Sequence, residues 1–416
     1  MGERIKRRRV RTHGDNLYGI FTLAVSRVER LSPSYVRVSL TGPSLRYAVD
    51  SVSMGGLNAD AHETGEQNTT RSEGELGSYR GVLDGYVKLL VPPTAERDEH
   101  GRITRLKPEP VHIDLTDTWR QDWFALPDTE RGWMRTYTLR ASRLRTPDAA
   151  LHKIIEALPA EPVIPAGVSM PGAPGIDSAL PETALPKNLL PEIDLDFVLH
   201  TEVSSDGVER MGPGATWATH AEAGDRVSIL APLAGQPLWA SWSSGGAERI
   251  ILAVDETAVP AALSILADYT AGSQKPAEIQ LIAEVPHTSD TLTALWDGPY
   301  PNLPAPNELP NLTVNWCARE EAPRGEALAT GLRKALGLGA QNSEVAPVIA
   351  EPSPDCAEES EVVWTLADDD NPQIYVFIAG EASVVKTLRR ICVQEASIPK
   401  NDVSFMGYWK TGRTES

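Results

Sequence analysis

The chain has 416 residues, which is long enough for two domains with separate hydrophobic cores. Its net charge of −18 argues against general nucleic-acid binding, because that function needs a basic surface. The three cysteines, Cys317, Cys356 and Cys392, form no C-x-x-C pair, so we expect reduced thiols rather than disulfides or an iron–sulfur site. The eight histidines show no metal-binding spacing, and we expect no protein-bound metal.

The N-terminus has a basic tail, residues 1–14, followed by an apolar stretch from Leu17 to Val25. This arrangement is superficially that of a signal peptide. However, Arg27 and further charges follow at once, without a small-residue cleavage site. We therefore predict a first strand over Phe21–Val28 and a solvated tail, with contact to nucleic acid or a membrane surface as the alternative. No apolar run in the chain approaches the length of a membrane span.

Residues 15–240 contain short strand-like runs separated by turn signals, which predict an antiparallel β-barrel. After the first strand, the predicted strands are Tyr35–Leu40, Tyr86–Val91, Val111–Leu115, Arg135–Arg140, Leu195–His200 and Arg226–Leu230.

Residues 245–416 alternate apolar strands with helical segments, which predicts a parallel sheet in an α/β domain. The predicted strands are Ile250–Val254, Ile279–Ala283, Leu312–Trp316 and Ile374–Ala379, and the predicted helices are Val259–Tyr269, Glu326–Leu336 and Ala382–Ala396. In the last helix, we expect an apolar stripe that includes Val384 and Leu388 to be buried. We expect its basic face, with Lys386, Arg389 and Arg390, to be solvated.

Three stretches do not fit this compact plan. Residues 51–80 are rich in small polar residues, residues 159–191 are rich in proline, and residues 341–370 contain nine acidic residues and no Lys or Arg. Such compositions bury too little apolar surface to offset the entropy of ordering the chain. We interpret them as surface insertions that are dispensable for chemistry.

The most informative segment is R-T-Y-T-L-R, residues 135–140, which resembles the R-x-Y-T pattern with which flavin reductases of the ferredoxin-reductase type hold FAD. The Arg135 guanidinium can pair with a pyrophosphate through two hydrogen bonds. On a strand, Tyr137 faces the same side two residues later, where its ring can stack on an isoalloxazine. Thr138 faces the other way, with a hydroxyl that can reach a flavin ring nitrogen.

Further motifs follow in order: D-F-V-L-H at 196–200, G-P-G-A-T-W-A at 212–218, A-G-D-R-V at 223–227, L-A-V-D-E-T-A-V-P-A at 252–261, A-G-E-A-S-V-V-K at 379–386, and F-M-G-Y-W-K-T-G-R at 405–413. Together with the R-x-Y-T strand, the series resembles the siderophore-interacting protein family, which consists of FAD-dependent ferric-siderophore reductases. The resemblance extends from about Val25 to Arg413, apart from the three insertions.

The resemblance implies a ferredoxin-reductase-like fold and three sets of site residues. The FAD set is Arg135, Tyr137, Thr138, Leu139, Arg140, His200, Gly214, Ala215, Thr216 and Trp217. The NAD(P)H set is Asp255, Glu256, Thr257, Ala258, Gly380 and Glu381. The substrate set is Lys88, Lys410 and Arg413. Two residues depart from the family pattern, since Ala215 replaces the usual serine and Lys410 the more frequent arginine.

Local chemistry leaves other roles open for several of these residues. His200 can simply bond a loop carbonyl, and Glu256 and Thr257 can cap the helix that we expect from Ala258. The three substrate cations can be ordinary surface charges. Trp409 can stack over the flavin or merely cover the core.

The glycines before Thr216 let the backbone approach a phosphate, and a helix starting near Trp217 would offer free N–H groups to it. No G-x-G-x-x-G follows a strand, so we expect no classical dinucleotide fingerprint. Instead, Asp255 to Ala258 end the first strand of the second half, at the sheet edge where open parallel sheets bind ligands.

We therefore expect a cytoplasmic enzyme that uses FAD to pass electrons from NAD(P)H to iron(III) in a ferric siderophore. Ferredoxin is an alternative electron donor. The alternative functions are a flavin oxidoreductase with a different acceptor and a non-catalytic siderophore- or flavin-binding protein on the same fold.

Overall fold

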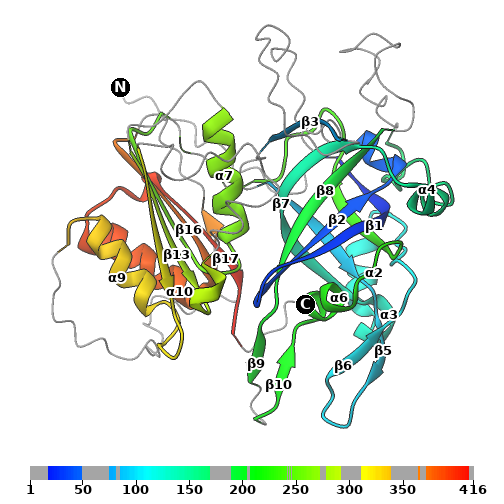
Figure 1. The fold of residues 1–416 in the computed structure, drawn as a ribbon, viewed down its shortest axis with the longest axis horizontal. Coiled ribbons are helices and arrows are strands. Elements are labelled where there is room, and N and C mark those ends of the chain that lie inside the picture. Colours follow the sequence, from blue (N-terminus) through cyan, green and yellow to red (C-terminus); the bar gives the residue numbers. More distant parts are fainter. Residues whose placement is uncertain are drawn as a thin grey trace, which may run out of the picture.

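The computed structural model describes residues 17–48, 75–80, 85–168, 189–203, 207–240, 242, 244, 246–271, 278–291, 311–338, 364–365 and 372–411. The predicted basic tail, Arg413 and the greater part of the insertions 51–80, 159–191 and 341–370 lie outside the described residues. In Figure 1 a barrel and an α/β domain lie side by side.

Among the described residues, six antiparallel strands close into a barrel in the order β7-β4-β11-β1-β2-β8, with β8 pairing back onto β7. Their bounds are β1 Tyr18–Ser32, β2 Tyr35–Thr41, β4 Tyr86–Val91, β7 Trp133–Arg145, β8 Leu190–Val198 and β11 Arg226–Pro232. A further strand, β3 (Glu75–Arg80), pairs with β7. The predicted barrel is confirmed.

The barrel core follows from side-chain alternation along these strands. On β2, Val36, Val38 and Leu40 point inward and join an apolar cluster with residues of every other barrel strand. Helix α6 (Pro213–His220) completes this core, since Trp217 and Ala218 belong to the same cluster. The cluster places the start of α6 against the barrel, close to β7 and β8.

Short helices and strands lie around the barrel. They are η2 (Pro43–Tyr47), β5 (Thr94–Arg97), β6 (Ile103–Leu106), α2 (Trp119–Ala125), α3 (Asp128–Arg131), α4 (Ala149–Ile155), β9 (Thr201–Val203) and β10 (Glu209–Met211).

The strand predicted over Val111–Leu115 is wrong. Val111, Ile113 and Leu115 are buried in alternation with exposed residues, but the segment belongs to no strand. They pack with Trp119 and Trp123 in a second apolar cluster. The alternation of buried and exposed residues therefore arises because one side of the segment is buried, and not because the segment pairs with a neighbouring strand.

In the second half, five parallel strands of the described chain lie in the order β14-β13-β12-β16-β17, and the short β15 pairs antiparallel with β17. Their bounds are β12 Arg249–Val254, β13 Glu278–Val285, β14 Leu312–Ala318, β15 Trp364–Thr365, β16 Ile374–Glu381 and β17 Val403–Trp409. The predicted combination of barrel and parallel sheet is confirmed.

Helices cover both faces of this sheet. They are α7 (Val259–Ala271), α9 (Glu326–Ala335) and α10 (Ala382–Arg390), with a π-helical turn, η7 (Ile391–Glu395), and the 3-10 turns η4 (Thr288–Asp290) and η8 (Lys400–Asp402). Helix α7 lies between the sheet and the barrel, whereas α9 and α10 cover the far face (Figure 1). The apolar stripe predicted for the last helix is buried there.

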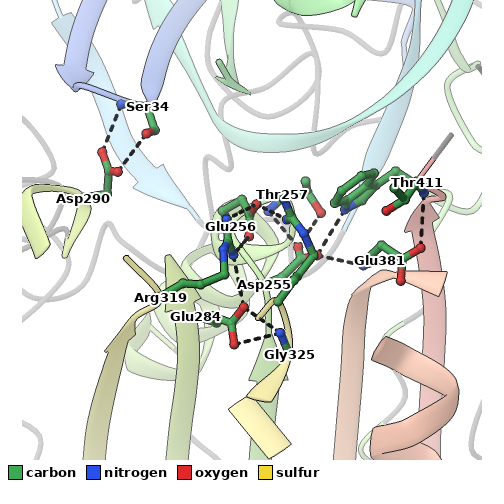
Figure 2. A network of polar contacts seen from close by, with 12 residues as sticks. Ser34, Asp255, Glu256, Thr257, Glu284, Asp290, Arg319, Gly325, Glu381 and Thr411 are labelled. Carbon is green, nitrogen blue, oxygen red and sulfur yellow. Dashed lines mark hydrogen bonds and ion pairs between the residues drawn. The ribbon is translucent and has the colours of Figure 1, made fainter. Parts of the chain in front are cut away.

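Buried hydrogen bonds join the two halves. The Ser264 hydroxyl of α7 lies 3.1 and 3.0 Å from the carbonyl oxygens of Leu139 and Arg140, where β7 makes a bulge. Asp290 of η4 accepts hydrogen bonds from the backbone N–H and hydroxyl of Ser34, at 2.9 and 2.7 Å (Figure 2). The bonds fix the edge of the parallel sheet that faces the barrel.

Candidate functional site

The R-x-Y-T strand and the glycine turn, far apart in sequence, meet in the structure. The Tyr137 ring lies 4.2 Å from the Phe197 ring, which in turn lies 5.5 Å from Trp217 of α6. A Cβ atom on Gly214 would lie 2.0 Å from the Tyr137 hydroxyl oxygen. Only glycine therefore lets the start of α6 lie this close to the tyrosine.

Helix α6 begins at Pro213, so the helix start predicted near Trp217 is wrong by four residues. Proline suits the first helical position, because a backbone N–H there has no intrahelical partner, so its absence loses no hydrogen bond. Gly212 is the N-cap, and the Thr216 N–H already bonds its carbonyl at 2.9 Å. The N–H groups available at this end are consequently those of Gly214 and Ala215.

These residues fit an FAD pyrophosphate and ring. Gly212 is exposed, and a Cβ there would meet no atom within 4 Å, so the helix start is open to a ligand. Arg135 and Tyr137 are only half-buried. Leu139 and Arg140, by contrast, are buried at the β7 bulge, and Thr216 and Trp217 are buried within α6.

Gly214→Ala should weaken FAD binding by about tenfold or more, because the added methyl group must displace the Tyr137 ring and misplaced contacts are costly. When Gly214→Ala is added to Tyr137→Phe, which lacks the hydroxyl oxygen nearest to the new methyl group, it should weaken FAD binding less than it does in the wild type. Titration with FAD measures the affinities. A wild-type affinity in Gly214→Ala, or the same loss in both backgrounds, would contradict this role of Gly214.

Lys88 lies on the other face of the barrel sheet from Tyr137. It is the cross-strand partner of Thr136, whose hydroxyl accepts a hydrogen bond from its ammonium group at 3.2 Å. Partners across a ladder share a face and successive residues alternate, so Lys88 and Tyr137 point apart. Binding of the substrate by Lys88 stays a prediction.

The predicted nucleotide residues gather where the strand order of the parallel sheet reverses. Strand β12 is followed in sequence by β13 on one side and pairs with β16 on the other, which makes the β12/β16 edge a topological switch point. Asp255 follows β12, and Gly380 and Glu381 end β16. Open α/β sheets bind ligands at such edges.

Side chains of this edge are largely engaged within the protein. Asp255, Glu256 and Glu381 are buried, and only Thr257 of the D-E-T-A turn is half-exposed. Glu381 caps α10 by accepting from the backbone N–H groups of Ser383 and Val384, at 2.7 and 3.1 Å. Contact between these carboxylates and a nucleotide stays a prediction.

Two arginines absent from the sequence-based site neutralise this acidic edge. Arg319 bonds both Glu256 and Glu284 at 3.1–3.2 Å (Figure 2). Arg324 also bonds Glu256. Glu284 also accepts from the backbone N–H of Gly325 at 2.8 Å. No motif marks these arginines, because they lie in the irregular loop after β14.

The two adjacent acids titrate in opposite directions. Burial, together with the neighbouring Glu256 charge, raises the pKa of Asp255 to about 6. Burial also opposes ionisation of Glu256, but Arg324 and Arg319 hold its pKa below the usual value. Glu256 is thus the charged partner of the arginines, and Asp255 takes up a proton more readily than an ordinary aspartate.

His200 and Trp409 link the barrel to the sheet edge. Their rings lie 5.1 Å apart, and the Trp409 indole donates a hydrogen bond of 3.1 Å to Asp255. We call the contact zone of His200, Trp409 and Asp255 the seam. It unites a predicted FAD residue with a predicted nucleotide residue. The next residue, Lys410, is exposed beside the seam, whereas Arg413 lies outside the described residues.

Within the part of the chain that the structure describes, no group of three or more His, Cys, Asp or Glu is placed to hold a metal ion. Across the same described residues, no helix is both long and apolar enough to cross a membrane. Cys317 and Cys392 are free thiols, and Cys356 lies outside the described residues.

The structure thus combines a closed antiparallel barrel, a parallel sheet, and an aromatic strand against a glycine-rich helix start, which is the architecture expected of a ferredoxin-reductase-like fold. A family model described as Siderophore-interacting FAD-binding domain matches residues 185–236, and one described as Siderophore-interacting protein matches residues 247–412. The chain belongs to the siderophore-interacting protein family.

Among solved structures, the chain is similar to a siderophore utilization protein from T. fusca, with 21% identity, 95% of each chain covered and a TM-score of 0.46. It is also similar to the siderophore-interacting protein SipS from Aeromonas hydrophila, with 17% identity, coverage of 95% and 93%, and a TM-score of 0.44. A third is a siderophore-interacting protein from Acinetobacter baumannii, with 14% identity, coverage of 95% and 92%, and a TM-score of 0.45.

Proposed function

We propose that this protein is a cytoplasmic, FAD-dependent reductase that passes electrons from NAD(P)H to iron(III) in ferric siderophores. The observation that carries the proposal is the seam, where His200 from the barrel stacks on Trp409, which bonds Asp255 at the switch point. A flavin held by the barrel and a nucleotide at the sheet edge would meet there. Family membership supports the siderophore as substrate.

The barrel residues would bind and orient FAD. Arg135, half-buried on β7, would pair with the pyrophosphate, and the N–H groups of Gly214 and Ala215 would bond the same anion at the start of α6. Tyr137, braced by Phe197, would lie beside the isoalloxazine.

Bound FAD supplies the step between two-electron and one-electron chemistry, because it accepts a hydride and releases electrons singly. On the nucleotide side, Thr257 offers a half-exposed side chain at the switch point. Arg319 and Arg324 balance the negative charge of Glu256, which would otherwise repel the phosphates of a nucleotide. In this proposal, the nucleotide and the flavin would lie on either side of one seam.

Iron(III) in siderophores is held by hard oxygen donors, which bind iron(II) more weakly, so reduction releases the metal. A protein with a net charge of −18 needs local cations to attract an anionic chelate. Lys410 is exposed next to Trp409 and is proposed to attract the chelate. Arg413, three residues later in the chain, is proposed to act with it.

Arg135→Ala should weaken FAD binding by about 1.5–3 kcal/mol, the usual range for a hydrogen bond to a charged group. Arg105→Ala is the control, because Arg105 is exposed on β6 and pairs only with the equally exposed Glu96 among the described residues. FAD titration monitored by flavin fluorescence gives both constants. If Arg135→Ala bound FAD with the wild-type dissociation constant, Arg135 would not hold the pyrophosphate.

A further inference from the structure

Asp255 is built into the seam more firmly than a helix cap requires. Its carboxylate is fully buried and accepts four hydrogen bonds from the described chain. The backbone N–H and hydroxyl of Thr257 bond one oxygen at 2.8 and 2.6 Å, and the Glu381 N–H and the Trp409 indole bond the other at 2.7 and 3.1 Å. One carboxylate thus joins its own turn, the end of β16 and the end of β17.

The backbone of β16 is shaped around this carboxylate. Gly380 has φ of 148°, and a Cβ there would lie 2.4 Å from the Asp255 carboxyl carbon. A residue with a side chain would be strained in this backbone conformation and would also clash with the carboxylate. Since burying a carboxylate is costly, this fitted environment indicates that its position matters.

Trp409 depends on polar contacts for its own position. It is only half-buried at the end of β17 and belongs to none of the apolar clusters of the described chain. The Arg324 guanidinium lies 4.5 Å from its ring centroid, and the ring of His200 lies 5.1 Å away. The bond from its indole N–H to Asp255 is what sets the rotation of the ring between these neighbours.

We propose that Asp255 is a positioning residue for the electron-donor half-reaction, and that it acts by holding Trp409 at the seam. The inference rests on the proposed function, because it assumes that a nicotinamide nucleotide approaches the switch-point edge. Asp255 itself stays buried and touches no substrate. Loss of its bond to Trp409 lets the indole rotate and changes how the donor fits.

The test is a double-mutant cycle between Asp255→Ala and Trp409→Phe in the full chain loaded with FAD. Trp409→Phe keeps an aromatic ring but loses the N–H donor together with the pyrrole half of the indole. Ala is used instead of Asn, because an Asn whose amide oxygen faced Glu381 and Trp409 would still accept the indole hydrogen bond. Each single variant should slow flavin reduction by NADH or NADPH about 10- to 100-fold, as expected for a misplaced reactant.

The double variant should be no slower than the slower single variant, because both changes remove the same contact. The FAD dissociation constant and reoxidation by a ferric chelate should change less than about twofold. If Asp255 served only to cap the turn, the two effects would multiply. The proposal would be overturned if the double variant slowed flavin reduction by the product of the two single effects. It would also be overturned if the flavin of Trp409→Phe were reduced at the wild-type rate.

A second readout needs no activity. In ¹H–¹⁵N spectra, the indole signal that disappears in Trp409→Phe identifies the Trp409 N–H, and it should move toward the position of a solvent-exposed indole in Asp255→Ala. An unmoved signal would also overturn the proposal. If the wild-type flavin is reduced by neither NADH nor NADPH, the proposed function fails separately, and the spectra still test the contact.

Discussion

Asp194→Asn is expected to lower the free energy of unfolding by about 3–5 kcal/mol, the usual cost of breaking a buried ion pair from one side. Asp194 on β8 is fully buried and accepts from both terminal nitrogens of Arg143, at 2.7 and 2.9 Å, and from the Ser39 hydroxyl at 2.6 Å. Arg143 is 1% exposed, so water cannot replace the lost charge, and the guanidinium keeps only part of its pairing, through Glu192. Urea unfolding of the two proteins at pH 7 measures the difference.

Glu96→Gln is the matched control, because it removes one charge from the exposed Arg105 pair, whose side chains are 64% and 60% exposed. Such a pair contributes only about 0–1 kcal/mol. A loss for Asp194→Asn no larger than that of the control would show that the barrel does not depend on the buried pair.

The effect of Asp194→Asn should also depend on pH. Burial favours the neutral acid, but Arg143 and the Ser39 hydroxyl hold the pKa of Asp194 below its usual value. A depressed pKa contributes stability that is present above the unfolded pKa of about 3.9 and is lost as the pH falls below it. The difference between wild type and variant should therefore shrink in acid.

Arg319→Met is expected to cost about 3 kcal/mol of unfolding free energy at pH 7, because it leaves two buried carboxylates with fewer partners. Glu256 keeps only Arg324 among the arginines that contact it in the described chain, and Glu284 keeps its backbone bonds to Gly325 and Leu328. The Met side chain retains most of the volume, so the loss is electrostatic rather than a cavity effect.

Arg333→Met is the control for this variant. Arg333 makes the same kind of two-bond pair with Glu395, at 2.8 and 2.9 Å, but the side chains are 24% and 36% exposed. The control should lose about 1 kcal/mol or less. Burial opposes ionisation of Glu256, but Arg324 and Arg319 hold its pKa below its usual value. The stability that depends on the charged Glu256 is therefore lost as the pH falls, and the deficit of Arg319→Met should narrow in acid. A deficit that is independent of pH would contradict the electrostatic cause.

The fold was largely predictable because side-chain periodicity reports burial, and most buried segments here are strands or helices. Tyr86–Val91 was predicted with the observed bounds, and the R-x-Y-T strand extends from Trp133 to Arg145 around its predicted part. Val111–Leu115 shows the limit of this reasoning, because a segment buried on one side has the same pattern whether or not it pairs with a neighbour.

The site was predictable where a short motif carries the chemistry. Tyr137 and Gly214 were expected near one ligand, and the structure brings them into contact. Arg319 and Arg324 could not be found in this way, because an isolated arginine in a loop carries no pattern, and only the three-dimensional fold places them beside Glu256. The same holds for the contact between Trp409 and Asp255, which joins residues 154 positions apart.

The most direct test of the proposed reductase is an anaerobic stopped-flow experiment on the full chain loaded with FAD. NADH or NADPH should bleach the flavin absorbance, and subsequent mixing with a ferric siderophore should restore it while an iron(II) chelator captures the released metal. If neither nucleotide bleaches the flavin, the experiment is repeated with reduced ferredoxin. Bleaching by ferredoxin would indicate a different electron donor, and no bleaching would indicate an inactive protein. A flavin that is reduced but is not reoxidised by any ferric siderophore would contradict the proposed function.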